Sequence, residues 1–150
     1  MIIMNFESIK SGNESSVREF EKQLGFDLPK DYKNFLIQND GVKFVNYSHF
    51  YVSVLEQNVL IDILYGVTGE KRYSITRQNN IFKDEIPEKS LLIGEDPGGT
   101  PILLICEGKN SGVYFFDNNY FFEDSSDEQN TYWLADTFTE FMHLLVCEKE

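Results

Sequence analysis

Leu28-Pro29-Lys30-Asp31-Tyr32-Lys33-Asn34-Phe35-Leu36 is the stretch of sequence that decides the fold of this chain. Proline suits the first position of a helix, because the N–H that it lacks has no helical partner there. The large side chains Tyr32, Phe35 and Leu36 follow at helical spacing and form one apolar stripe. A helix running to about Asn39 is therefore predicted, with Gly41 just beyond its end.

A second helix is predicted directly before this stretch, over residues 13–25. Ser16 and Glu19 have the spacing of a capping box, and Gly25 suits the left-handed conformation that often ends a helix. The apolar stripe of this helix consists of Val17, Phe20 and Leu24. Because the connection to the next helix is short, the two helices are expected to pack as a helical hairpin.

Extended structure is predicted for most of the middle of the chain. Residues 43–67 are rich in β-formers and include a strand-length apolar run from Val59 to Tyr65, and residues 69–80 fit a short helix with a basic face. Three apolar runs then follow with short turns between them, at residues 90–94, 102–106 and 113–117. This pattern indicates an antiparallel meander, with residues 120–122 as a candidate fourth strand.

The end of the chain predicts a third apolar helix. Thr137 and Glu140 have capping-box spacing. The wide apolar face consists of Leu134, Phe138, Phe141, Met142, Leu145 and Val146. The expected fold is therefore α+β in one domain over residues 1–150, with the helical hairpin and this C-terminal helix packed on a mostly antiparallel sheet of about five to six strands.

The order of these pieces resembles the SUKH superfamily. The resemblance lies in Leu24-Gly25, in residues 28–36 and in Asn39-Asp40-Gly41, although members usually have Asn before that glycine. It continues through the later tracts, which are residues 92–99, 102–104, 112–117 and 134–141. The resemblance spans roughly residues 13–146 and implies helices packed on a largely antiparallel sheet.

The resemblance also implies a function. The resemblance implies an immunity protein, since most bacterial members bind and neutralise a cognate polymorphic toxin, often a nuclease. A yeast relative regulates cell-wall synthesis as an interaction module. The resemblance implies no catalytic residues. Residues 47–69 and 123–132 fall outside the matching pieces, and partner specificity is expected in these two segments.

Charge is distributed very unevenly along the chain. The net charge is −12, and residues 84–150 carry all of it, with 15 Asp or Glu against 3 Lys. An acidic surface keeps a protein soluble, repels nucleic acid and anionic membranes, and attracts basic proteins. Residues 84–96 hold five acids and one lysine, and residues 117–128 hold five acids and no base.

In an antiparallel meander the turns at residues 95–101 and 117–119 can lie at the same end of the sheet, so the two clusters are expected to form one negative surface. The expected partner-binding residues are Glu95, Asp96, Asp117, Glu123, Asp124, Asp127, Glu128, Tyr120 and Tyr132, with Phe121 and Trp133 interleaved. The alternative interpretation places Phe121 and Trp133 in the core and leaves the acids as ordinary solvated surface.

Catalysis and cofactors are not expected. Cys147 and His143 have the i, i+4 spacing that would let them touch on a helix, which leaves a thiol hydrolase as an alternative, but no third orienting group is visible. The acids around Glu95 and Glu123 lack the fixed spacing of a Ca²⁺ site. With no signal-like start and no long apolar run, a cytoplasmic protein with reduced cysteines is expected.

The resemblance and the acidic charge together predict a non-catalytic immunity protein that binds a basic toxin of the nuclease class, because a nuclease needs a basic groove for phosphates. Neither nucleic acid nor membrane is expected as a partner, and the chain is expected to be a monomer or a weak homodimer. The alternative function is a regulatory protein–protein interaction module without a toxin partner.

Overall fold

The computed structural model describes residues 6–45, 47–68, 71–117 and 131–148. Within these ranges the fold is α+β, with four α-helices, a seven-stranded sheet in the order β1-β2-β5-β6-β7-β8-β9 and a three-stranded sheet in the order β10-β3-β4. The large sheet consists of β1 (Phe6–Ser8), β2 (Val42–Phe44), β5 (Ile63–Leu64), β6 (Ser90–Glu95), β7 (Pro101–Ile105), β8 (Gly112–Phe116) and β9 (Thr131–Ala135). The small sheet consists of β3 (Tyr47–Val52), β4 (Gln57–Leu60) and β10 (Val146–Glu148). All pairings between these strands are antiparallel, so the predicted fold class is confirmed and the large sheet has more strands than expected.

The helical hairpin consists of α1 (Glu14–Leu24) and α2 (Lys30–Gln38). Asn13 caps α1 by accepting the Ser16 N–H at 2.7 Å, so the cap lies three residues before the serine that the sequence pattern suggested. Gly25 adopts the expected left-handed conformation, with φ of 81°. The Glu21 carboxylate joins the two helices, because it accepts the Leu28 N–H and the Lys33 ammonium, both at 2.8 Å.

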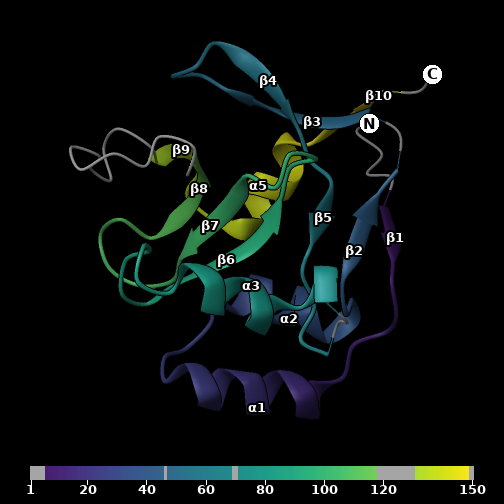
Figure 1. Ribbon diagram of the computed structural model, residues 1–150, viewed down its shortest axis with the longest axis vertical. Coiled ribbons are helices and arrows are strands. Elements are labelled where there is room, and N and C mark those ends of the chain that lie inside the picture. The colour runs from purple at the N-terminus through teal and green to yellow at the C-terminus, as the bar shows by residue number, and fades with distance from the viewer. Residues whose placement is uncertain (1–5, 46, 69–70, 118–130, 149–150) are drawn as a thin grey trace.

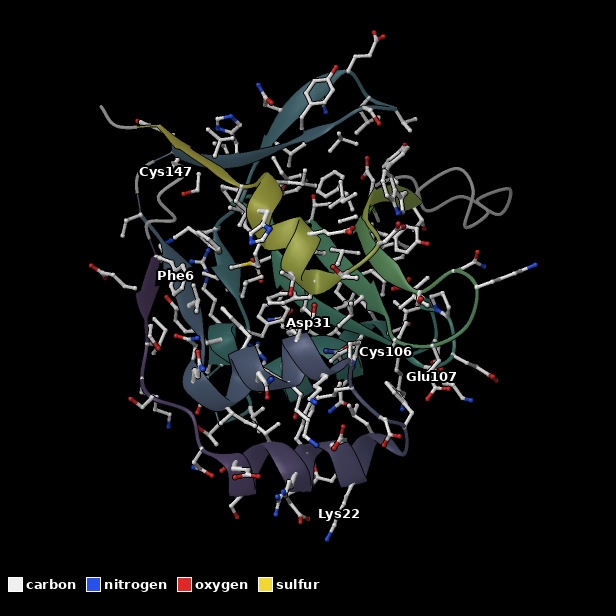
Figure 2. All side chains as sticks on the ribbon, turned by 180° about the vertical axis from the view of Figure 1, so that it is seen from behind. Phe6, Lys22, Asp31, Cys106, Glu107 and Cys147 are labelled. Carbon is white, nitrogen blue, oxygen red and sulfur yellow. The ribbon has the colours of Figure 1, made fainter. Side chains whose placement is uncertain are left out.

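The helices form layers along the long axis of the molecule. Figure 2 shows α1 outermost, then α2, then α5 (Phe138–Leu144), with the small sheet beyond α5. Tyr32 and Leu36 of α2 are buried, and the rings of Tyr32 and Phe138 meet edge to face at 5.0 Å. Asp31 holds α5 in place, since its carboxylate accepts the Thr139 N–H and hydroxyl at 2.9 and 2.8 Å.

The apolar run from Val59 to Tyr65 was expected to be one strand, and this expectation is wrong. Val59 and Leu60 pair with β3 in the small sheet, whereas Ile63 and Leu64 pair with β2 and β6 in the large sheet. The chain changes sheets at Asp62, whose side chain is only 10% exposed and binds Lys43 and Arg72. A buried carboxylate with two cationic partners therefore marks the crossing between the sheets (Figure 1).

Strand β6 lies at the centre of the large sheet. All six of its residues are buried, and β7 is buried on both faces as its continuous apolar sequence predicted. Helix α3 (Ile75–Phe82) extends the pairing of β6 where β5 is too short to do so. The Asn79 amide accepts the Leu92 N–H at 2.8 Å and donates to the Leu92 carbonyl at 2.9 Å, in the manner of a neighbouring strand.

The last part of the chain is where the predicted elements differ most from the structure. Residues 131–135 form strand β9, although the sequence pattern placed Leu134 on the apolar face of the closing helix. Leu134 therefore belongs to β9, while Leu145 and Val146 follow the end of α5 at Leu144. Val146 is 40% exposed, so it does not belong to the buried face of a helix. The candidate fourth strand at residues 120–122 lies outside the described residues.

Candidate functional site

The strand register brings the two expected acidic turns to the same end of the large sheet. Glu95 at the end of β6 lies opposite Pro101 at the start of β7, and Phe116 at the end of β8 lies opposite Thr131 at the start of β9. Asp96 and Asp117 follow β6 and β8 directly, and one strand separates these two strands. Two strand spacings are roughly 9–10 Å, so both aspartates lie at one edge of the sheet.

Asp96 is held inward by the turn that it forms. One of its carboxylate oxygens accepts the N–H groups of Gly98 at 2.9 Å and Thr100 at 2.8 Å. Its own N–H donates to the Thr100 carbonyl, and Gly99 has a φ of 87°, which glycine adopts without strain. Asp96 therefore shapes the turn as well as contributing negative charge to this edge.

Glu95 lies below the surface. It is 9% exposed, and its carboxylate accepts the Tyr65 hydroxyl at 2.8 Å. Burial, followed by the hydrogen bond to Glu95, raises the pKa of Tyr65 well above its usual value, so the tyrosine stays neutral and donates. Glu95 contributes to the field at this edge but offers little surface for contact with a partner.

The remaining expected contact residues divide into two groups. Asp117 and Tyr132 are each partly exposed, and Tyr132 packs against the core from β9, opposite Phe115. Trp133 is 50% exposed and donates its indole N–H to Asp136 at 3.1 Å, so it is not a core residue. The other expected residues, together with Phe121, lie outside the described residues, and these are Tyr120, Glu123, Asp124, Asp127 and Glu128.

The expected acidic cluster at residues 84–96 is divided by strand β6. Asp84 and Glu88 precede the strand, whereas Asp96 follows it, and six extended residues span roughly 20 Å. Glu88 and Glu107 line an open depression of about 590 Å³ at the far end of the meander, and Lys89 pairs with Glu107 at 3.1 Å. Only Glu95 and Asp96 of this cluster therefore lie at the same edge as Asp117.

The thiol hydrolase alternative required Cys147 and His143 to lie one turn apart on the same helix. His143 is exposed on α5, but Cys147 lies in strand β10, so the two residues do not share a helix. Figure 2 shows Cys147 in the small sheet and Cys106 beside α2. Burial raises the pKa of the Cys106 thiol to about 12, which disfavours the reactive thiolate.

Two features of the described residues bear on other functions. In these ranges, no group of three or more His, Cys, Asp or Glu side chains is arranged to hold a metal ion. No helix in the described part of the chain is both long and apolar enough to cross a membrane.

One exposed surface was missed by the sequence pattern. Residues 47–52 were recognised as β-formers, but their alternation places Tyr47 and Tyr51 on the solvent face of β3, more than half exposed. The signal was the period of two that separates these tyrosines from Phe50 and Val52. This strand begins one of the two segments in which partner specificity was expected.

A family model and a known protein both match most of this chain. The model of the SMI1 / KNR4 family (SUKH-1) matches residues 12–143, which run from just before α1 into α5. The SPbeta prophage-derived protein YokK of Bacillus subtilis (strain 168) is similar, with 24% identity, and the alignment covers 88% of this chain and 73% of that protein. The match includes α1, α2, α3 and all of α5 except its last residue, and it leaves out β1 and β10.

Proposed function

The chain belongs to the SMI1 / KNR4 family (SUKH-1), and from this membership we propose that it is an immunity protein. In this proposal it is a non-catalytic cytoplasmic inhibitor that binds and neutralises a cognate bacterial polymorphic toxin. The proposed target is a nuclease domain, either RNase or DNase. A nuclease must have a basic groove to hold phosphates, and the net charge of −12 on this chain favours a basic partner.

The proposed contact surface is the acidic edge of the large sheet. It consists of Asp96, Asp117, Tyr132 and the residues Tyr120, Glu123, Asp124, Asp127 and Glu128 of the segment between β8 and β9. Glu95 is buried and supports this surface through its charge rather than by contact. Acids speed the encounter with a basic partner, and the tyrosines supply apolar contact area.

Co-expression in a bacterial host tests the proposal. The chain is expressed together with the C-terminal toxin domain encoded by the neighbouring upstream gene, and growth is measured. The wild-type chain is expected to restore growth. Reversal of Glu123, Asp124, Asp127 and Glu128 to lysine is expected to abolish the rescue, because it replaces attraction by repulsion.

The matched control reverses four exposed acids around α1, namely Glu7, Glu14, Glu19 and Asp27. This variant has the same net charge as the first but keeps the acidic edge, so it is expected to retain the rescue. Equal rescue by both variants would remove the acidic edge from the proposal. A chain that has no toxin gene beside it and rescues no toxin would favour the regulatory interaction module instead.

A further inference from the structure

The small sheet turns one face toward the core and leaves the other in solvent. On β3, Phe50 is fully buried, and its ring meets those of Phe115 and Phe141 edge to face at 5.9 and 5.6 Å. Tyr47 and Tyr51 point the other way and are 53% and 54% exposed. The inner face therefore fixes the sheet on the molecule, and the outer face is available to a partner.

The strand register collects side chains into a continuous outer face. Val146 of β10 and Leu60 of β4 both lie opposite His49 of β3, so the three residues form a row across the sheet. Tyr47 and Tyr51 flank this row, two residues to either side of His49, because side chains two apart on a strand share a face. Among the described side chains, the outer face consists of Tyr47, His49, Tyr51, Asn58, Leu60 and Val146, none of which is Asp, Glu, Lys or Arg.

Exposed apolar side chains are concentrated here. Nine large apolar side chains are exposed among the described residues, and five of them belong to the small sheet or its β3–β4 turn. These five are Tyr47, Tyr51, Val54, Leu60 and Val146, and a sixth, Leu144, ends helix α5 just before β10. Single exposed apolar residues are ordinary, whereas contiguous ones rimmed by polar groups mark interaction surfaces.

The edges of the small sheet are less suited to binding than its outer face. Strand β4 has four residues and β10 has three, so neither offers a long row of free backbone groups for pairing. Two half-exposed tyrosines beside aliphatic residues instead resemble the anchors of a protein interface.

Charge decides which partner this face would accept. A second copy of the chain also carries −12, so two copies repel each other at long range. Glu56 is exposed in the β3–β4 turn beside the outer face, and the backbone of Glu148 lies opposite that of Tyr47 in the register. A basic protein with apolar side chains at its contact surface is attracted by the negative charge of this chain and covers the apolar outer face.

The outer face also adjoins the acidic edge. Strand β3 packs beside β9, and β9 begins at Thr131, separated by two residues from the acidic segment 117–128. Figure 1 shows the β3–β4 hairpin above the start of β9. One partner is therefore able to reach the acidic edge and the outer face together.

We propose that the outer face of the small sheet is a second contact region for the basic toxin, with Tyr47 and Tyr51 as its anchors. This inference rests on the immunity function proposed above. In it, the acidic edge mainly sets the rate of association, and the outer face slows dissociation once the partner is bound.

Binding kinetics with the purified toxin domain of the neighbouring gene test this inference. The variants Tyr47→Ala and Tyr51→Ala are each expected to weaken binding by about 30-fold or more, mostly through faster dissociation. The control is Ile81→Ala on α3, which removes a 59% exposed apolar side chain elsewhere and is expected to leave binding within about threefold. Circular dichroism and thermal unfolding check that each variant is folded.

A pair of substitutions at Leu60 provides a readout that folding defects would not reproduce. Leu60→Lys and Leu60→Glu remove the same apolar contact, but they place opposite charges against the partner. Association of the lysine variant is expected to be about tenfold slower than that of the glutamate variant at low salt, and the difference is expected to shrink at high salt.

The outcomes separate the two proposals. If wild-type chain binds the toxin and the tyrosine variants bind equally well, the outer face is not a contact region, while the immunity function stands. If wild-type chain does not bind the toxin, the immunity function fails, and this inference fails with it. If sedimentation shows a wild-type dimer that Tyr51→Ala dissociates, the outer face binds a second copy and the inference is overturned.

Discussion

Single polar atoms inside the core determine how several substitutions should act. Tyr32 is completely buried, and its hydroxyl has no hydrogen-bond partner among the described residues. Tyr65 is buried to a similar degree, but its hydroxyl donates to Glu95 at 2.8 Å. The two tyrosines therefore offer the same chemical group in a paired and an unpaired state.

Replacement by phenylalanine is expected to have opposite effects at these two positions. Tyr32→Phe removes an unpaired buried hydroxyl and is expected to raise the free energy of unfolding by about 1 kcal/mol. Tyr65→Phe leaves a buried carboxylate without its donor and is expected to lower it by about 1–3 kcal/mol. Urea unfolding at neutral pH measures both. An equal loss of stability in the two variants would contradict the difference between these sites.

Asp40 occupies the position where the family usually has asparagine. It is 4% exposed and accepts the Thr68 N–H at 3.0 Å and the Thr68 hydroxyl, so it ties the end of α2 to the segment after β5. Lys10 lies 3.8 Å from the same carboxylate. The side-chain oxygen at this position, rather than its charge, makes the contact with the Thr68 N–H.

Substitutions at Asp40 separate these two contributions. Asp40→Ala is expected to lower the free energy of unfolding by about 2–3 kcal/mol, because the Thr68 N–H loses its acceptor. Asp40→Asn keeps an oxygen acceptor, and the Thr68 hydroxyl is able to accept from the new amide, so a loss below about 1 kcal/mol is expected. Chemical denaturation compares the two variants, and an asparagine variant as unstable as the alanine variant would show that the charge is essential.

At the scale of elements, Glu21 links the two helices of the hairpin through charge. Its carboxylate is 16% exposed and binds the Lys33 ammonium and the Leu28 N–H. Burial by itself raises the pKa of Glu21, but the hydrogen bonds to Lys33 and Leu28 outweigh it, so the pKa lies below its ordinary value of 4.5. The stabilisation is therefore present above about pH 4.5 and is lost as pH falls through the lowered pKa.

The variant Glu21→Gln tests this link. The wild-type chain is expected to be more stable than the variant at pH 7 by about 1–2 kcal/mol, and this difference is expected to shrink near pH 3. The control is Glu19→Gln on the exposed face of the same helix, whose effect is expected to stay small at both pH values. A difference for Glu21→Gln that does not change with pH would mean that the carboxylate charge does not join the helices.

Elements with a strong local pattern were predicted well. The helices around Phe20 and Tyr32 and the three meander strands follow from apolar spacing, proline and glycine alone. The run from Val59 to Tyr65 was misassigned because one acidic residue does not end a strand-length apolar run, whereas the strand partners change at that residue, Asp62. Strand β9 was missed because it is short. An exposed residue such as Trp133 followed by a buried one such as Leu134 occurs in helices as well as in strands.

At the scale of the whole molecule, the sequence indicated the acidic edge of the large sheet better than the outer face of the small sheet. The meander register follows from short turns, so Asp96 and Asp117 were correctly placed at one edge. Burial of Glu95 was not predictable, because its carboxylate accepts a hydrogen bond from the hydroxyl of Tyr65, which lies 30 residues away in the sequence. The outer face of the small sheet was not predictable either, because it needs β10, at the C-terminal end of the sequence, to pair with β3.

The measurement that tests the proposed function most directly is a titration of the purified toxin domain of the neighbouring gene with this chain. Nuclease activity and binding are followed together at about 0.05 M and 0.5 M salt. The proposed function predicts complete inhibition at one equivalent, with association that slows markedly at the higher salt. Nuclease activity that persists in excess chain, or binding whose rate is unaffected by salt, would contradict it.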